Sequence, residues 1–487
     1  MLKLNDESLL RADAFIDGAW TPAASGARFA VRNPATGEEL AQVADLDAAD
    51  ARRAIEAADT AWPAWRARTA KERAQLMRKW FELILANQED LARIMTAEQG
   101  KPLAETRGEV AYGASFIEWF AEEGKRVYGD VVPTFAAGKR VLVFKEPVGV
   151  VAAITPWNFP NAMITRKAAP ALAAGCTFLI KPPAETPLSA LALAVLAQRA
   201  GIPKGVFNVV TSDQAPEIGR EFTESPMVRK FSFTGSTEIG KLLMRQSAST
   251  VKKVTLELGG NAPFIVFDDA DLDAAVDGAM ASKYRNMGQT CVCANRFLVH
   301  DKVYDAFAAK LAARVAQFKL GNGMDDGVTQ GPLINEDAVE KVERLLADAT
   351  AKGATIATGG KRSALGRTFF EPTIVTGATP AMDLAREEIF GPVAPLFRFT
   401  TEAQAIAMAN DTEFGLAAYF YTRDIGRTIR VAEGLEYGIV GVNEGIISSE
   451  VAPFGGMKQS GIGREGSKYG IDDYLEIKYV LLGGLGA

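Results

Sequence analysis

The hydrophobic pattern of the chain changes near Pro147. From there, short apolar runs alternate with helical segments, at 148–154, 177–182, 206–210 and 230–233. Continuous apolar runs of this length, bounded by turn residues, are typical of strands that are buried on both faces of a parallel sheet. The intervening helices supply the crossovers that parallel strands need. The pattern therefore predicts a doubly wound α/β unit that binds a dinucleotide.

Other patterns precede this predicted sheet. Residues 14–45 alternate short apolar runs with turn signals such as Asp17-Gly18 and Asn33-Pro34, which predicts an antiparallel edge. Residues 47–126 place apolar side chains at helical spacing and are predicted to be mostly helical. Residues 127–143 are predicted to form a strand, a turn and a strand. That hairpin fits a surface element and an oligomerisation element equally well.

A second α/β unit is predicted from Glu257 to about Ser448. Its apolar strands are FIVF, FLVH and IVGV, separated by helices such as 301–319. The tail from Tyr474, YLEIKYVLLGG, has the pattern of a strand and is too apolar to remain exposed. We expect it to pair across a subunit interface.

Composition excludes several classes of protein. The 487 residues are 48% hydrophobic, enough for two or three domains with sizeable cores. A net charge of −6 gives no reason to expect nucleic acid. The amino terminus has neither the pattern of a signal peptide nor that of a membrane anchor. Three cysteines, two of them one residue apart, do not form a disulfide framework, so a reducing cytoplasmic location is expected. No metal site is predicted.

The candidate chemistry centres on a thiol and an acid. Cys291 lies in KYRNMGQTCVCANRFLVH, where a turn containing glycine places it before an apolar run. His300, the only histidine, would lie about 30 Å away along an extended run, which disfavours a Cys-His hydrolase dyad. Glu257 stands in the apolar stretch VTLELGGNAPFIVF, where burial would make it a usable base near neutral pH. An isolated cysteine, however, is more often a small buried hydrophobe.

LELGG followed by GQTCVCANR resembles the aldehyde dehydrogenase superfamily, and the likeness extends from about Asp17 to Tyr479. It is most similar to the branch that oxidises succinate semialdehyde. The resemblance implies that Cys291 is the nucleophile and that Glu257 activates the water that hydrolyses the thioester. It also implies that the Asn158 side chain and the backbone N–H of Cys291 form an oxyanion hole. Alone, Asn158 before Pro160 would indicate only a turn.

The resemblance also implies the fold class: α/β, aldehyde dehydrogenase-like, with a doubly wound parallel sheet cofactor domain, an α/β catalytic domain and a small β oligomerisation element. The expected boundaries are 1–125 and 147–257 for the cofactor domain, 258–455 for the catalytic domain, and 126–146 and 470–487 for the oligomerisation element. The expected partners are a small-molecule aldehyde and further copies of the chain, as a dimer or tetramer, without nucleic acid or membrane.

Cofactor binding is expected at the carboxyl ends of the first strands. TGSTEIGK, at 234–241, follows a strand and begins a helix whose amino terminus favours a phosphate. On its own, such a glycine turn more often only connects a strand to a helix. Lys181, at a strand end, could hold the adenosine ribose or a 2′-phosphate, or could be merely exposed. The resemblance implies that Glu388 holds the nicotinamide ribose and that Phe390 backs the ring. The expected set is Thr155, Pro156, Trp157, Asn158, Lys181, Ala184, Gly235, Ser236, Leu258, Glu388 and Phe390.

The choice between NADP and NAD depends on Ala184. One branch of the family has a glutamate at this position, where it binds the ribose hydroxyls; here KPPAETP places the acid one residue later, as Glu185. Direct repulsion of a 2′-phosphate is therefore not expected, and Lys181 can pair with it. NADP+ is the expected acceptor, with NAD+ as a second one. A shift of the loop by one residue would bring Glu185 into contact and reverse this expectation.

Substrate binding is assigned by resemblance. Arg166, Arg285 and Ser448 match positions that hold the distal carboxylate of succinate semialdehyde, with Ser449 as the alternative to Ser448. Arginines are more often surface or ion-pair residues, and that interpretation stays open for both. Glutarate semialdehyde is one methylene longer and would meet the same residues, since one methylene contributes only about 1–3 kcal/mol of discrimination.

Two further functions compete with oxidation of an aldehyde. The first is a thiol esterase or acyl-hydrolase that uses Cys291 without a nucleotide. The second is a binding protein without catalytic activity, in which the catalytic residues would have been lost. Here all four are present: Asn158, Glu257, Cys291 and Glu388.

Cys293 is a candidate redox residue. In an extended segment Cys291 and Cys293 would face the same side, with α-carbons about 6.6 Å apart, at the far edge of disulfide geometry. A bridge between them would be strained and easily reduced, so a reversible oxidative switch is one hypothesis, as in relatives with this motif. The alternative is that Cys293 is a small packed residue.

Overall fold

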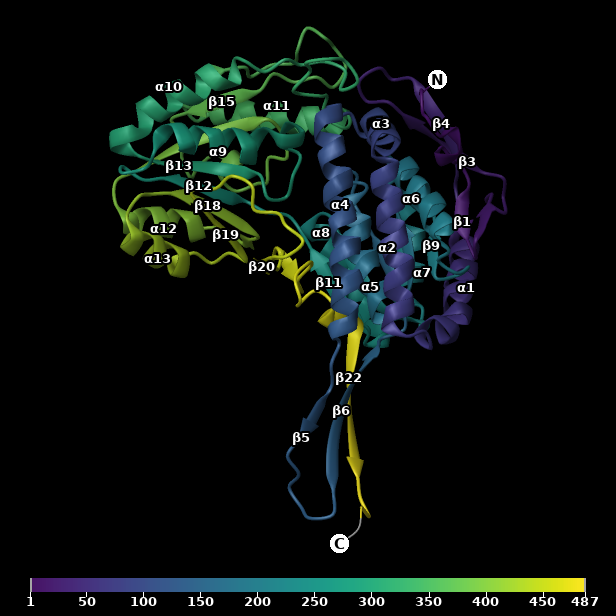
Figure 1. Ribbon diagram of the computed structural model, residues 1–487. Coiled ribbons are helices and arrows are strands. Elements are labelled where there is room, and N and C mark those ends of the chain that lie inside the picture. Colours follow the sequence, from purple (N-terminus) through teal and green to yellow (C-terminus); the bar gives the residue numbers. More distant parts are fainter. Residues whose placement is uncertain (1, 486–487) are drawn as a thin grey trace.

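The computed structural model describes residues 2–485. Two layered α/β units lie side by side, and a narrow three-stranded flap projects from the body (Figure 1). Within the described residues no helix is long and apolar enough to cross a bilayer. The predicted α/β class is confirmed.

The first sheet has the order β2-β1-β9-β8-β7-β10-β11-β21, with β7 to β11 parallel. The predicted buried strands are present, and further strands are added at both edges of the sheet. β1 and β2 form the expected antiparallel edge, and β21 returns from the end of the chain to pair with β11. The strands are β1 (Ala14–Ile16), β2 (Ala19–Thr21), β7 (Val150–Ile154), β8 (Thr177–Lys181), β9 (Phe207–Val209), β10 (Val228–Thr234), β11 (Lys253–Glu257) and β21 (Gly461–Ile462).

The prediction of an antiparallel edge over residues 14–45 was wrong in its second half. β3 (Arg28–Arg32) and β4 (Glu39–Ala44) pair only with each other and form a separate ribbon. The period-2 pattern shows that a segment is a strand, but it does not show which strand it pairs with.

Helices cover both faces of the first sheet (Figure 1). One core contains Trp80, Phe120 and Leu193, and the other contains Ile55 and Phe222. α1 and α2 each begin with a capping box, which satisfies backbone N–H groups at the helix start. The helices are α1 (Ala48–Arg66), α2 (Ala70–Ala86), α3 (Gln88–Gln99), α4 (Leu103–Glu123), α5 (Ala162–Ala174), α6 (Pro187–Ala200), α7 (Ala215–Glu224) and α8 (Thr237–Ser247).

The second sheet has the order β14-β15-β16-β13-β12-β18-β19 and is parallel apart from β14. Its strands are β12 (Ala262–Val266), β13 (Ala294–His300), β14 (Thr355–Thr358), β15 (Thr373–Thr376), β16 (Val393–Phe399), β18 (Ala417–Tyr421) and β19 (Ile439–Val442). The helices around it are α9 (Leu272–Tyr284), α10 (Tyr304–Val315), α11 (Glu336–Ala351), α12 (Glu402–Asn410) and α13 (Ile425–Gly434). A short pair, β17 (Phe414–Gly415) and β20 (Met457–Lys458), lies beyond this sheet.

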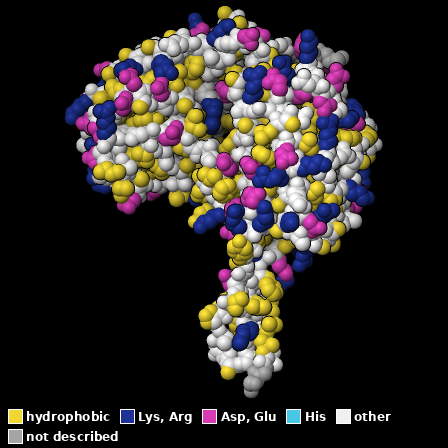
Figure 2. Space-filling model, viewed as in Figure 1, with side chains coloured by type: hydrophobic (Ala, Val, Ile, Leu, Met, Phe, Trp, Pro, Cys, Tyr) yellow, Lys and Arg dark blue, Asp and Glu magenta, His cyan; other side chains and the backbone are white. Residues whose placement is uncertain are grey.

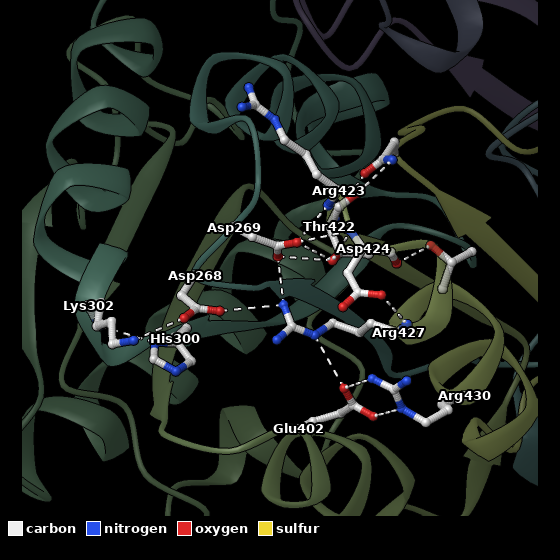
Figure 3. Close-up of polar contacts among 12 residues, drawn as sticks. Asp268, Asp269, His300, Lys302, Glu402, Thr422, Arg423, Asp424, Arg427 and Arg430 are labelled. Atoms are coloured by element: carbon white, nitrogen blue, oxygen red, sulfur yellow. Dashed lines mark hydrogen bonds and ion pairs between the residues drawn. The ribbon is translucent and has the colours of Figure 1, made fainter.

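A polar network ties the carboxyl end of β12 to α12 and α13 (Figure 3). The Asp269 carboxylate accepts hydrogen bonds from Thr422 Oγ1 at 2.8 Å, from Asp424 N at 3.0 Å and from Arg427 Nη1 at 2.6 Å. Arg427 also pairs with Glu402 on α12. Since the Arg427 side chain is only 20% exposed, this pair is less screened than an ordinary surface ion pair. The network therefore fixes the carboxyl ends of β12 and β18. The candidate active site lies at the opposite, amino end of β12.

The flap contains β5 (Asp130–Val132), β6 (Arg140–Pro147) and β22 (Leu475–Leu482). β22 pairs with β6 of the same chain along its whole length, and its other edge has no strand partner among the described residues. Hydrophobic side chains gather on the flap (Figure 2), where Val131 is 76% exposed and Ile477 is 73% exposed. The ladder that the structure shows is therefore intrachain, and pairing across a subunit interface stays a prediction.

Candidate active site

A cavity of about 410 Å³ lies at the carboxyl ends of β7, β10 and β11, where open α/β sheets bind ligands. Its walls bring together predicted site residues from both units of the chain. Those that line it are Pro156, Trp157, Asn158, Arg166, Gly235, Ser236, Glu257, Leu258, Cys291, Glu388, Phe390 and Ser448. Thr155, Lys181, Ala184, Arg285 and Cys293 do not line this cavity.

The turn before Cys291 has an unusual backbone. Asn286, Met287 and Gly288 adopt left-handed conformations, with φ of 50°, 56° and 75°. A Cβ at residue 288 would lie 2.2 Å from the carbonyl oxygen of Gly391, so only glycine fits. Glu105 accepts from Asn286 N at 2.9 Å, and Gln99 donates to Asn286 Oδ1 at 2.9 Å. These contacts from the first unit hold a turn that non-glycine residues otherwise disfavour.

Cys291 is half-buried and lines the cavity. Burial raises the pKa of its thiol to about 12, and the nearby Glu388 carboxylate adds to this effect. A Cβ at Gly260 would lie 2.5 Å from the carbonyl oxygen of Cys291. The LELGG motif and the cysteine turn are therefore in direct backbone contact because residue 260 has no side chain.

Asn158 lies against the same turn. Its Nδ2 donates to Gln289 O at 3.1 Å, and its own carbonyl oxygen accepts from Lys101 Nζ at 2.7 Å and from Asn286 Nδ2 at 3.2 Å. Lys101 is buried in an ion pair with Glu109. The side-chain amide is thus held beside the turn that carries the thiol.

Glu257 ends β11 and is buried, with no hydrogen-bond partner for Oε2 among the described residues. Burial raises its pKa well above the ordinary value, and the negative charge of Glu465 raises it further. Burial also opposes ionisation of Glu465, but Lys167 and Arg166 outweigh that effect and hold its pKa below the ordinary range. Glu465 therefore carries the charge, while Glu257 tends to keep its proton.

Arg166 lines the cavity but already has a partner. Its Nη2 lies 2.8 Å from Glu465 Oε2, and the guanidinium lies over the rings of Phe454 and Phe116 at 4.0 and 5.4 Å. Arg285 lies beside the cavity, with its guanidinium 5.3 Å from the ring centre of Phe159. The open interpretation of Arg166 as an ion-pair residue matches this geometry.

The loops that close the nucleotide side of the cavity fit a dinucleotide. Gly235 and Ser236 precede α8, and Ser236 caps that helix by accepting from Ile239 N. The buried hydroxyls of Thr155 and Thr234 have no hydrogen-bond partner among the described residues, and that of Thr234, which lines the cavity, remains available to a ligand. The helix amino terminus and this hydroxyl suit an anionic diphosphate and its riboses.

Glu388 and Phe390 stand opposite these loops. Glu388 Oε1 accepts from Gly260 N at 3.0 Å, and burial raises the pKa of Glu388 to about 7. Phe390, with φ of 53°, contacts Trp157 edge to face at 5.6 Å. The carboxylate and both rings therefore face one cavity from two units of the chain.

Lys181 and Ala184 lie deeper along the same sheet edge. Lys181 ends β8, pairs in register with Ile154 and is buried, which lowers its pKa. Ala184 and Glu185 follow in the next loop and line a separate hollow of about 340 Å³. The negative charge of Glu185 lies close enough to Lys181 to offset part of this lowering of its pKa. The sequence left open whether Glu185 would come this near.

The extended segment that would place Cys291 and Cys293 on one face is not present. Residues 291–293 form a turn in which Cys293 N donates to Thr290 O at 2.9 Å. The Cys293 thiol is buried and lies 3.5 Å from the carbonyl oxygen of Lys283, away from the cavity. Both thiols are free. An oxidative role for Cys293 stays a prediction, but the extended geometry that suggested it is absent.

His300 is at the opposite end of β13 from the thiol. Its Nε2 lies 3.1 Å from Thr400 O, and its Nδ1 accepts from Lys302 N at 3.2 Å. Figure 3 shows it beside the Asp268–Lys302 pair. It is not a base for Cys291, in agreement with the sequence argument against a Cys-His dyad.

Several residues of this site were not predicted from the sequence. Tyr112, Phe454 and Lys341 line the cavity, and Lys101 and Glu465 hold residues that do. Tyr112 and Lys101 lie in or next to helices with ordinary amphipathic patterns, and no local signal sets them apart. Glu465 follows GIGR, which the sequence identifies as a turn. The sequence does not show that this turn packs against α5.

The geometry, with a thiol, a buried carboxyl group and an amide in one cavity at a nucleotide-binding sheet edge, is that of an aldehyde-oxidising enzyme. The family model described as "Aldehyde dehydrogenase family" matches residues 20–480, so the chain belongs to the aldehyde dehydrogenase family. Members of this family depend on NAD(P).

Similar proteins cover nearly the whole chain. Glutarate-semialdehyde dehydrogenase of Pseudomonas aeruginosa is 64% identical over 99% of this chain and 100% of its own length. Succinate-semialdehyde dehydrogenase [NADP(+)] GabD of Escherichia coli is 63% identical over 99% and 100%. The crystal structure of succinate-semialdehyde dehydrogenase from Burkholderia pseudomallei superposes with a TM-score of 0.98 at 66% identity, covering 99% and 100%.

Proposed function

We propose that this aldehyde dehydrogenase oxidises succinate semialdehyde to succinate with NADP+, and with NAD+ as a second acceptor. The observation that carries the proposal is that Cys291, Glu257 and Asn158 share one cavity with Arg166 and Ser448. The names of relatives at 63–66% identity support the substrate class. Glutarate semialdehyde is the second candidate because a relative of equal similarity is named for it.

The reaction begins when the Cys291 sulfur attacks the aldehyde carbon and the thiol proton passes to solvent. A thiol whose pKa is about 12 is mostly protonated at neutral pH, so proton transfer accompanies attack. The negative charge that develops on the carbonyl oxygen needs donors, and we assign this role to Asn158 Nδ2 and the Cys291 N–H, which the resemblance to the family implies. The product is a thiohemiacetal on Cys291. A nicotinamide nucleotide held by Glu388, Phe390 and the loop at 235–236 would supply the hydride acceptor that converts this thiohemiacetal on Cys291 into a thioester.

Glu257 completes the cycle. Its buried carboxylate takes a proton from water, the water oxygen bonds to the thioester carbon, and the Cys291 sulfur leaves. The raised pKa of Glu257 makes its ionised form a stronger base than an exposed carboxylate. The network of Glu465, Lys167 and Arg166 keeps a fixed charge arrangement next to this base.

The NADP+ assignment rests on Lys181 and Ala184. Lys181 is the cation at the end of β8, and residue 184 carries no carboxylate, although the charge of Glu185, one residue later, does act on Lys181. A 2′-phosphate would pair with Lys181, whereas an acid at residue 184 would repel it. Glu388, Phe390, Trp157 and the loop at 235–236 would hold the nicotinamide half of the nucleotide.

Ala184→Glu is expected to reduce kcat/KM for NADP+ by about tenfold or more while changing that for NAD+ by less than threefold, because it sets a second negative charge against the 2′-phosphate at a half-buried position. Initial rates with each nucleotide at saturating aldehyde measure this. Ala184→Gln is the matched neutral variant and should affect both nucleotides alike. An equal loss with Ala184→Glu on both nucleotides would show that residue 184 does not face the 2′ position.

The proposed function is tested by a rate survey. Reduced nucleotide is followed with aldehydes of three to six carbons, with and without a terminal carboxylate, and with both nucleotides. The proposal requires succinate semialdehyde to give the highest kcat/KM of the set; a maximum at glutarate semialdehyde would favour the second candidate. Ester cleavage without aldehyde-dependent reduction of nucleotide would favour the thiol esterase instead.

The remaining assignments are proposals of the same kind. We place the cofactor domain at 1–125 and 147–257, the catalytic domain at 258–455, and the oligomerisation element at 126–146 and 470–487. The exposed apolar flap supports association of copies of this chain as a dimer or tetramer. The free cysteines suit a cytoplasmic location.

A further inference from the structure

A tyrosine that the proposed chemistry does not use lines the same cavity. Tyr112 lies in the middle of α4, and its buried hydroxyl oxygen has no partner of good hydrogen-bond geometry among the described residues, although the Ser448 side chain lies near enough to lower its pKa slightly. Such an unpaired hydroxyl is unfavourable relative to the same group in water. A polar atom of a bound ligand would satisfy it.

Other side chains hold the ring of Tyr112 in place. It contacts Phe116 edge to face, with centroids 5.1 Å apart and an interplanar angle of 81°. Ser115 on the same helix donates to the Tyr112 carbonyl oxygen at 2.8 Å and to Glu450 Oε2 at 3.3 Å. Glu450 also accepts from Ser449, so α4 is tied to the loop that carries Ser448. The ring is therefore held in place, and its hydroxyl lies near the Ser448 side chain in the same cavity.

Two guanidinium groups act on this hydroxyl. Burial raises the pKa of Tyr112, and the charges of Arg166 and Arg285 oppose this only in part, so the phenol keeps its proton and can donate. Arg166 is already paired with Glu465 at 2.8 Å. Because this pair is close to neutral, Arg166 provides less attraction for a substrate anion than a free arginine would, and neutral donors must contribute more.

We propose that Tyr112 is a substrate-binding residue whose hydroxyl, with that of Ser448, donates a hydrogen bond to the anionic group at the far end of the aldehyde. This inference rests on the proposed function and deepens it. It assigns recognition of the distal carboxylate to a donor pair on α4 and on the 443–450 loop, beside a cation that is held by Glu465. An aldehyde with a methyl group in place of the carboxylate gains nothing from either hydroxyl.

Tyr112→Phe removes one oxygen and keeps the ring contact with Phe116. Steady-state rates are measured with succinate semialdehyde and with butanal, which has the same carbon number, at saturating NADP+. The expected result is a fall of about tenfold or more in kcat/KM for succinate semialdehyde, mostly through KM, and a change of less than twofold for butanal. Tyr304→Phe, which removes a buried hydroxyl bonded to Leu396 O outside the cavity, is the control.

A second readout is independent of turnover. Inhibition by succinate, compared with butyrate, reports binding of the distal carboxylate, and Tyr112→Phe should weaken succinate about tenfold and butyrate little. Equal losses on charged and uncharged ligands would show that Tyr112 is structural, and unchanged kinetics would also overturn the inference. If the wild-type enzyme itself fails to prefer succinate semialdehyde over butanal, the proposed function fails and this inference fails with it. A wild-type preference that survives in Tyr112→Phe overturns only the role of Tyr112.

Discussion

Cys291→Ala is expected to reduce aldehyde-dependent nucleotide reduction by more than about 10³-fold. No other thiol can replace Cys291, because Cys293 lies against Lys283 and Cys176 is buried in the first core. Nucleotide binding should be unchanged, since the loop at 235–236 and Glu388 do not depend on the sulfur. Initial rates and a fluorescence titration with NADPH measure the two properties.

Cys176→Ala is the control for that experiment. It removes a buried thiol outside the cavity and should keep most of the turnover. Turnover within tenfold of wild type in Cys291→Ala would show that the nucleophile has been misassigned.

Glu257→Gln should separate the two halves of the reaction. The first turnover produces reduced nucleotide in amounts close to one per active site, and then the steady-state rate falls by about 10²–10⁴-fold because no base activates the water. Stopped-flow absorbance shows the burst, and mass spectrometry of the intact protein shows the acyl group on Cys291. Added hydroxylamine, an external nucleophile, should release the acyl group and restore turnover. A normal steady-state rate would mean that another group is the deacylation base.

The same residue gives turnover a pH dependence. Burial raises the pKa of Glu257, and only its ionised form accepts a proton from water, so deacylation accelerates as pH rises towards that pKa. The sign for stability is the reverse: relative to the unfolded chain, the raised pKa favours the folded state at low pH, and that contribution is lost as pH rises through the folded value. Wild-type steady-state rates should show the rise with pH, and Glu257→Gln should not.

Much of this architecture could be predicted because the signals are local. Continuous apolar runs predicted β7 to β10, and those strands carry Asn158, Lys181 and Gly235 at their carboxyl ends. Glu257 and Cys291 were found through two motifs that meet in space because Gly260 admits the Cys291 carbonyl. In these cases chain order and sheet topology together bring the residues close.

The remaining features depend on tertiary contacts that no local pattern encodes. The pairing of Arg166 with Glu465 joins residues about 300 positions apart, so the sequence left an ion pair open for Arg166 but did not identify its partner. The extended geometry assumed for Cys291 and Cys293 failed because left-handed residues at 286–288 and a turn at 290–293 precede β13. Tyr112 was missed because a cavity-facing residue on an amphipathic helix looks like any core residue.

The return of β21 and Glu465 to the first unit has a consequence for biosynthesis. β11 receives its outer neighbour, and Arg166 and Lys167 receive their carboxylate, only from the last thirty or so residues of the chain. While the ribosome is still making the second unit, the nascent first unit must therefore hold two cations without a counter-ion and an open sheet edge. The first unit, although most of it is synthesised before the second, can reach its final structure only after residues 461–465 have left the exit tunnel.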